Sequence, residues 1–115
     1  MPEINAITLV TRNMAESVRF WTVAGLETTF GGPGDAFTTM RLGENYVNLT
    51  YEPGQRPGFW GRVIFHVPSP DALWRTFRAA GYEALTDPAD APWGERYFHI
   101  RDPDGHELSF ARRLA

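Results

Sequence analysis

Two histidines and a glutamate in the second half of the chain have the side chains best suited to proton transfer. His66 and His99 fall at polar positions of alternating, strand-like segments, and Glu107 falls at such a position in the last segment. A histidine beside a carboxylate can transfer protons near neutral pH, so His99 and Glu107 are candidate catalytic residues. With His66 they could also form a non-standard facial triad for a divalent metal, although spacing alone does not bring the three together.

The composition excludes several other kinds of site. The chain has 115 residues and no cysteine, which rules out disulfides, thiolate nucleophiles and thiolate metal ligands. Its net charge of −3 argues against nucleic acid as a partner. No segment resembles a signal peptide or reaches the length of a membrane span, so we expect a cytoplasmic protein with no membrane partner.

The elements that must position these residues follow a pattern that occurs twice. When the sequence is shifted by about 56 positions, each half reads as a strand, a helix and then three strands. We expect one domain of residues 1–115, with module one at about 1–54 and module two at about 59–115. The Pro- and Gly-rich segment 52–58 joins the two modules, and residues 87–92 are expected to be a loop between strands.

Both predicted helices have local start and stop signals. The first begins after Asn13, an N-cap residue, and Gly25 ends it. The second begins after the N-cap Ser69 with Pro70 at its first position, where the missing N–H has no cost, and Gly81 ends it.

The end of the chain is predicted to form a β-hairpin. Two alternating stretches, 95–101 and 106–112, flank the turn sequence Asp-Pro-Asp-Gly at 102–105. Proline presets φ in this turn and the glycine accepts a positive φ at its exit. His106, which follows the turn, is expected to be exposed.

Alternation along the strands separates two faces. One is aliphatic and lies under the helices, while the other mixes aromatic, amide, imidazole and charged groups, as a cavity for an organic molecule requires. Trp60 fits either a pocket wall or a dimer contact. Aromatic walls are expected from Phe37, Tyr46, Trp60, Trp93 and Tyr97, and orienting polar groups from Asn48, Arg62, His99, Glu107 and Ser109.

The tandem modules, together with the segments 9–21 and 92–110, resemble the vicinal oxygen chelate superfamily. This superfamily includes glyoxalase I, extradiol dioxygenases, fosfomycin-resistance enzymes and bleomycin-resistance proteins. The resemblance implies an α+β fold in which tandem βαβββ modules form a curved mixed sheet around a concave cavity, with helices on the outer face. It also implies a homodimer.

Enzymes of this superfamily hold a divalent metal with four side chains, whose positions fall here on Ala6, Asn48, Arg62 and Ser109. None of the four is a good ligand, and Arg62 would place a fixed positive charge where the cation should sit. The resemblance is therefore nearest to the metal-free bleomycin-resistance type, and we expect no cofactor. It implies binding and sequestration of an antibiotic, natural product or metabolite, and Arg62 favours an anionic or carbonyl-rich group on that ligand.

Two other functions remain open at this point. The chain could be a lyase, isomerase or dioxygenase that uses a divalent metal relocated to His66, His99 and Glu107. It could also be a purely structural dimerisation module whose concave face is filled by a partner.

Overall fold

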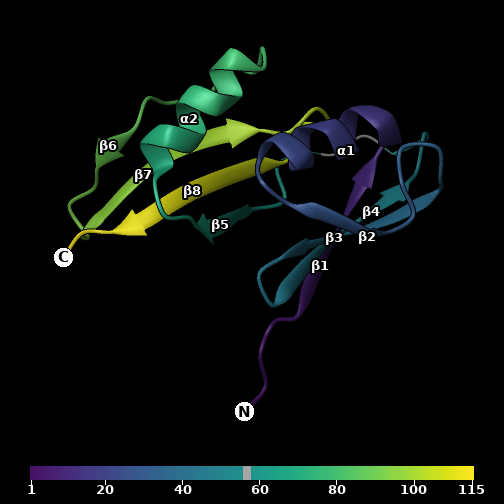
Figure 1. Ribbon diagram of the computed structural model, residues 1–115, viewed down its shortest axis with the longest axis horizontal. Coiled ribbons are helices and arrows are strands. Elements are labelled where there is room, and N and C mark those ends of the chain that lie inside the picture. Colours follow the sequence, from purple (N-terminus) through teal and green to yellow (C-terminus); the bar gives the residue numbers. More distant parts are fainter. Residues whose placement is uncertain (56–57) are drawn as a thin grey trace. The chain divides into compact units, whose positions relative to one another are not determined.

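A computed structural model describes residues 1–55 and 58–115, so part of the predicted joint at 52–58 lies outside the described residues. The chain divides into two compact units, Met1–Pro57 and Gly58–Ala115. Each unit consists of a four-stranded mixed sheet and one helix, as Figure 1 shows. This arrangement confirms the predicted α+β class and the strand–helix–strand–strand–strand order of each module.

The first unit has the sheet order β1-β4-β3-β2, in which β1 runs parallel to β4 and the other pairs are antiparallel. Because β1 and β4 are parallel, the helix that follows β1 belongs to the connection between them. Its elements are β1 (Ala6–Thr11), α1 (Met14–Val23), β2 (Glu27–Phe30), β3 (Phe37–Leu42) and β4 (Asn45–Tyr51).

The predicted signals of α1 are confirmed. Oδ1 of Asn13 accepts a hydrogen bond from the backbone N–H of Glu16 at 3.1 Å, and Gly25 has a φ of 103° just after the helix. The buried face of the helix carries Phe20 and Trp21, whose rings meet edge to face at 5.3 Å. The helix therefore covers the apolar face of its sheet, and the alternate strand residues point to the opposite side.

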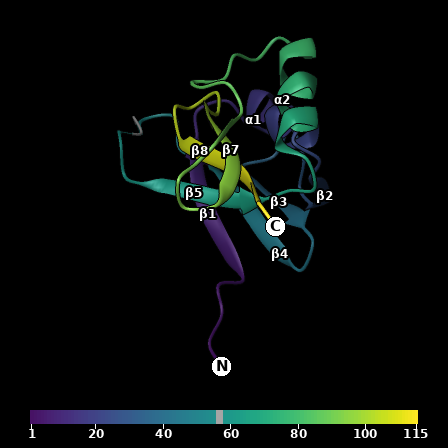
Figure 2. The same cartoon turned by 90° about the vertical axis from the view of Figure 1, so that its left-hand side faces the viewer.

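The second unit has the sheet order β5-β8-β7-β6, with β5 parallel to β8. Helix α2 contacts β7 and β8, and Figure 2 shows it along one side of these strands. The elements are β5 (Arg62–His66), α2 (Pro70–Ala79), β6 (Ala89–Asp90), β7 (Glu95–Arg101) and β8 (Glu107–Arg113).

The segment 87–92, predicted as a loop, contains the two-residue strand β6. Ala89 pairs with Tyr97 and Asp90 with Arg96 in an antiparallel ladder. Proline has no N–H to donate to a ladder, so Pro88 directly before the strand helps to keep this pairing short. The loop prediction was wrong for these two residues.

Aromatic rings form the core of the second unit. Phe77 of α2 lies 5.7 Å from Phe110 and 6.3 Å from Phe98, and Phe65 stacks on Phe110 at 5.3 Å. Oγ of the N-cap Ser69 accepts a hydrogen bond from a backbone N–H in the first turn of α2, as predicted. The helix thus covers one face of the sheet. The residues that alternate with these phenylalanines along the strands lie on the other face.

The predicted hairpin at the end of the chain is confirmed. The N–H of Gly105 donates to the carbonyl of Asp102 at 2.9 Å, and Gly105 has a φ of 91°. Because Pro103 fixes φ inside this turn, the turn sequence sets the register of β7 against β8.

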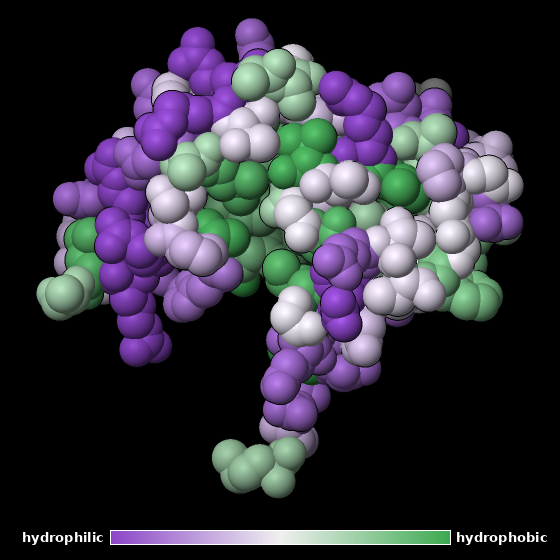
Figure 3. Space-filling model, in the orientation of Figure 1, coloured by the Kyte–Doolittle hydropathy of each residue, from purple (hydrophilic) through white to green (hydrophobic). Residues whose placement is uncertain are grey.

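The exposed segment before β1 projects from the first sheet. In Figure 3 the visible side of this segment is mainly hydrophilic and its tip is hydrophobic, at the place where Figure 1 marks the N-terminus; the exposed Ile4 also belongs to the segment. Among the described residues, no helix is both long enough and apolar enough to cross a bilayer.

Candidate functional site

The face of the second sheet opposite α2, here called the second polar face, gathers most of the predicted site residues of this unit. In the ladders Arg62 pairs with Glu107, and Ser109 lies between Ile64 on one side and His99 on the other. Tyr97 follows on the same face as His99, because alternate residues of β7 share a face. The structure therefore brings Arg62, Tyr97, His99, Glu107 and Ser109 onto one surface of one unit.

An aromatic row runs along this face. The ring of Trp93 lies 5.7 Å from that of Tyr97, and the ring of Tyr97 lies 4.9 Å from that of His99. Trp93 is 68% exposed, and its indole N–H donates to Oε1 of Glu95 at 2.9 Å, which fixes the orientation of the ring. A large exposed indole held in place beside two further rings offers a stacking surface.

One end of the row meets an ion pair. Nε of Arg62 donates to Oε1 of Glu107 at 2.9 Å, and Nη2 of Arg62 donates to the same oxygen. This hydrogen bond lowers the pKa of Glu107, so the carboxylate is ionised at neutral pH. Glu107 therefore balances the charge of Arg62, the residue from which an anionic or carbonyl-rich ligand group was expected.

His99 lies beside this pair as an uncharged ring. Burial, followed by the charge of Arg62, lowers the pKa of His99, while the opposing effect of Glu107 is smaller. At neutral pH the imidazole is therefore neutral and continues the aromatic row instead of adding a cation to it.

His66 is engaged at the other end of the sheet. Its Nε2 lies 3.0 Å from Oε2 of Glu95, whose other oxygen accepts from Trp93. The hydrogen bonds from Trp93 and then from His66 lower the pKa of Glu95. Within residues 1–55 and 58–115, no three histidine, aspartate or glutamate side chains are grouped so that they could hold a metal ion.

The face of the first sheet opposite α1, here called the first polar face, holds the remaining sheet residues of the prediction. Asn48 lies at its centre, where its Oδ1 accepts from Thr39 at 2.8 Å and its Nδ2 donates to Thr8 at 3.3 Å. Phe37 and Tyr46 lie at the two ends of the same ladder. These residues form a hydrogen-bonded polar strip with an aromatic ring at each end.

The residues at the superfamily's metal positions do not fit a divalent ion. The side chain of Ala6 has no donor atom, and the amide of Asn48 is used in hydrogen bonds to two threonines. Arg62 is a cation paired with Glu107, and the buried Ser109 offers only a neutral hydroxyl. We therefore derive no chemical step through a metal at these four positions.

His106, which was expected to be exposed, is buried at 3% exposure, so that prediction was wrong. Oδ1 of Asp102 accepts the backbone N–H of His106 at 2.9 Å, which bends the chain at the turn. The imidazole Nδ1 then accepts a 2.7 Å hydrogen bond from the indole of Trp60. Half-exposed Trp60 therefore covers a buried histidine, a contact that neither of its two sequence interpretations included.

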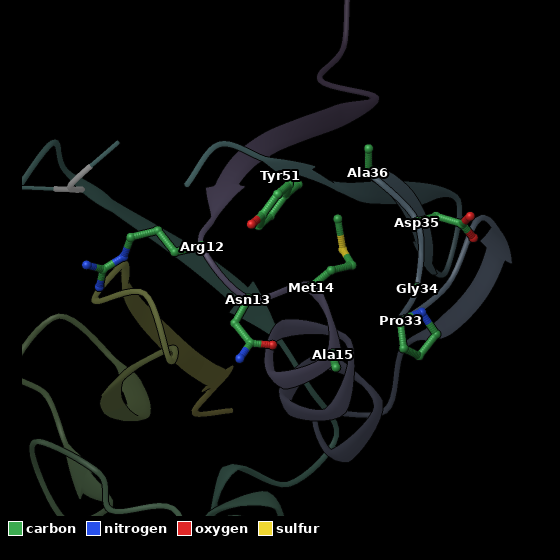
Figure 4. Close-up of a pocket in the computed structure, with 9 residues that line it drawn as sticks. All are labelled: Arg12, Asn13, Met14, Ala15, Pro33, Gly34, Asp35, Ala36 and Tyr51. Carbon is green, nitrogen blue, oxygen red and sulfur yellow. The ribbon is translucent and has the colours of Figure 1, made fainter. Parts of the chain in front are cut away.

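A cavity of about 440 Å³ lies in the first unit, and none of the predicted site residues lines it. The side chains of Met14 and Tyr51 lie side by side within it in Figure 4, while those of Arg12 and Asp35 point away. Of its lining residues, the sequence singled out Asn13, as the N-cap of the first helix, but not as part of a site. Its lining residues are Arg12, Asn13, Met14, Ala15, Pro33, Gly34, Asp35, Ala36 and Tyr51.

Several solved structures share this fold. A glyoxalase/bleomycin resistance protein/dioxygenase from Nocardioides is 24% identical, with a TM-score of 0.77, and the match covers 99% of this chain and 85% of that one. TioX from Micromonospora sp. ML1 is also 24% identical, with a TM-score of 0.79, and covers 98% and 100% of the two chains. A bleomycin-binding protein in complex with bleomycin is 16% identical, with a TM-score of 0.74 and coverage of 98% and 99%.

A sequence comparison gives the family directly. No protein of curated function matches the chain significantly. The sequence profile of one superfamily matches residues 3–110, which is nearly the whole chain. The chain therefore belongs to the glyoxalase/bleomycin resistance protein/dioxygenase superfamily.

Proposed function

We propose that this protein binds and sequesters a small organic ligand (an antibiotic, natural product or metabolite) without a metal and without covalent chemistry. The observation that carries the proposal is the row Trp93–Tyr97–His99, which ends at the Arg62–Glu107 pair. Aromatic side chains next to a few placed polar groups are the usual lining of a small-molecule site.

The contacts of the row support binding by stacking. A ring laid on Trp93 and Tyr97 gains about 0.5–1.5 kcal/mol for each aromatic pair beyond the area that it buries. The indole of Trp93 is already oriented by Glu95, so little side-chain freedom is lost when a ligand stacks on it.

The family and its structures support the class of ligand. The matching superfamily includes bleomycin resistance proteins by description, and one structural neighbour is a bleomycin-binding protein in complex with bleomycin. Bleomycin is therefore a reasonable first natural-product probe, and a planar synthetic compound such as 2-naphthamide is a second.

Calorimetric titration of the EDTA-treated protein with metal-free bleomycin and with 2-naphthamide tests the proposal. We expect saturable binding of at least one probe, with no dependence on added divalent metal and with the probe recovered unchanged after the protein is denatured. Trp93→Leu should weaken that binding at least about tenfold, because it removes the end of the row. Trp74→Leu, which alters a tryptophan of α2 away from the second polar face, is the matched control.

Three results would argue against the proposal. If neither probe binds, the proposal loses its support. Equal loss of affinity in the Trp93 and Trp74 variants shows that the row is not the site. Chemical conversion of a bound probe replaces sequestration by catalysis.

We also propose that the protein is a homodimer, as its resemblance to the superfamily implies, and that it is cytoplasmic. Light scattering during size-exclusion chromatography should then give a mass near twice the 13.0 kDa of one chain. A monomer at micromolar concentration would contradict this part of the proposal.

A further inference from the structure

The Arg62–Glu107 pair uses only part of its hydrogen-bonding capacity within the protein. Nε and Nη2 of Arg62 both donate to Oε1 of Glu107. Among the described residues, Nη1 of Arg62 and Oε2 of Glu107 have no hydrogen-bond partner. The two side chains are 38% and 12% exposed, so a donor and an acceptor remain available at a half-buried place.

This donor and acceptor lie next to the end of the aromatic row. His99 is close enough to both charged groups for each to affect its pKa, and its ring contacts Tyr97 at 4.9 Å. A planar ligand stacked along the row would therefore direct its edge toward Arg62 and Glu107. Ser109, which lies beside His99 in the ladder, is small and buried, so no bulky side chain of β8 projects beside His99 at this position.

The balance of charge at the pair disfavours a charged ligand edge. A carboxylate would accept from Arg62 but would face the ionised Glu107, whereas an ammonium would pair with Glu107 but face Arg62 and Arg101. An uncharged edge with a carbonyl beside an N–H satisfies both groups and loses less hydration on binding. Such an edge is found on lactams and on primary carboxamides.

We infer that the second polar face selects planar, uncharged ligands that carry a lactam or carboxamide edge. Arg62 donates a hydrogen bond to the carbonyl of this edge, and Glu107 accepts a hydrogen bond from its N–H. The inference rests on the proposed function and names the chemical class of its ligand. It also departs from the anionic or carbonyl-rich preference expected from Arg62 alone, because it requires the N–H as much as the carbonyl.

A matched series of naphthalene probes tests the inference on the whole chain. The series is 2-naphthamide, N,N-dimethyl-2-naphthamide, 2-naphthoate and 2-naphthylmethylammonium, titrated calorimetrically at pH 7.5. The ring is constant and only the edge changes. We expect 2-naphthamide to bind about tenfold more tightly than each of the other three, since each of them loses one of the two hydrogen bonds or adds an unbalanced charge.

The variant Glu107→Gln provides the second arm. An amide can still accept from Arg62 with its oxygen, but it replaces the free acceptor by an N–H₂ donor. The preference should therefore reverse, so that 2-naphthoate binds more tightly than 2-naphthamide. Glu83→Gln, at an exposed carboxylate of the same unit, should keep the wild-type order of affinities.

The possible outcomes separate this inference from the proposed function. Equal binding of all four probes, or an unchanged preference in Glu107→Gln, would overturn the inference while leaving a small-molecule binding protein. Failure of every probe to bind the wild-type protein would overturn the proposed function for aromatic ligands, and the inference with it.

Discussion

The indole N–H of Trp60 donates a 2.7 Å hydrogen bond to Nδ1 of His106, a histidine that is almost completely buried. The rings also meet edge to face, with centroids 5.8 Å apart. This contact joins the segment before β5 to the end of the hairpin turn. It explains why a histidine that follows a turn is buried instead of exposed.

Trp60→Phe should destabilise the protein by about 1–2 kcal/mol, because a buried imidazole nitrogen loses this donor while the edge contact can persist. Urea unfolding followed by circular dichroism measures the change. Trp93→Phe is the matched control and should change stability by less than about 0.5 kcal/mol, since Trp93 is highly exposed. Equal effects of the two substitutions would show that the bond to His106 contributes nothing specific.

Asp102 should make the protein less stable as the pH rises from about 4 to 6. Burial raises the pKa of Asp102 from 3.8 to about 6. His106 opposes this upward shift of the pKa, and the charge of Asp104 adds to it. In this window the unfolded chain has lost the proton that the folded chain retains, so the free energy of unfolding falls with increasing pH. Two pKa units correspond to about 3 kcal/mol.

Asp102→Asn removes this titration but keeps the oxygen that accepts from the backbone N–H groups of Asp104 and His106. The free energy of unfolding of the variant, relative to wild type, should therefore rise by up to about 3 kcal/mol between pH 4 and pH 7. Urea unfolding at the two pH values gives this difference. Asp87→Asn, at an exposed loop position, should show no such trend, and a parallel trend in both variants would contradict the assignment.

Gly31→Ala should destabilise the first unit by about 2 kcal/mol or more. Gly31 has a φ of 74°, and a Cβ placed there would lie 2.2 Å from the carbonyl oxygen of Phe37. The backbone must move, which also disturbs the bonds between Thr38 and Gly32. Gly34→Ala, where a Cβ has open space, should have a small effect in the same urea titration, and similar losses would reject the steric explanation.

The features predicted correctly from the sequence have local causes. The N-cap residues Asn13 and Ser69 bond to backbone groups three residues later, and Gly105 closes a turn with Asp102. Strand alternation likewise depends only on neighbouring residues, so the assignment of side chains to two faces agrees with the ladders. No partner distant in sequence is needed for any of these conclusions.

The features that could not be predicted from the sequence depend on contacts between residues that lie far apart in the chain. Arg62 pairs with Glu107 across 45 positions because β5 and β8 are parallel and in register, and this pairing changes the expected charge of the surface. Glu95 accepts from both Trp93 and His66, the latter 29 positions away, so His66 is not directed to a site with His99. Pattern alone could place these residues on a face but could not identify their partners.

Removal of divalent metals should not change the stability of the protein. The superfamily's metal positions are filled by residues that do not fit a metal, and among the described residues no other group of three suitable side chains exists. A metal that binds only the folded state raises the melting temperature. If no such metal is bound, its removal by a chelator leaves the melting temperature unchanged. We expect well under one equivalent of Zn, Ni, Mn or Fe in tag-free protein, and no shift of the melting temperature on chelation or on addition of these ions.

One equivalent of metal would instead support the metal-dependent enzyme if the shift of the melting temperature were lost in His66→Ala, His99→Ala and Glu107→Ala but kept in the control Asp87→Ala. Such a result would require His66 to leave Glu95 and Glu107 to leave Arg62 when the ion binds, since both side chains are engaged in the structure. Because each rearrangement gives up a hydrogen bond to a charged group, only a tightly bound ion could offset it.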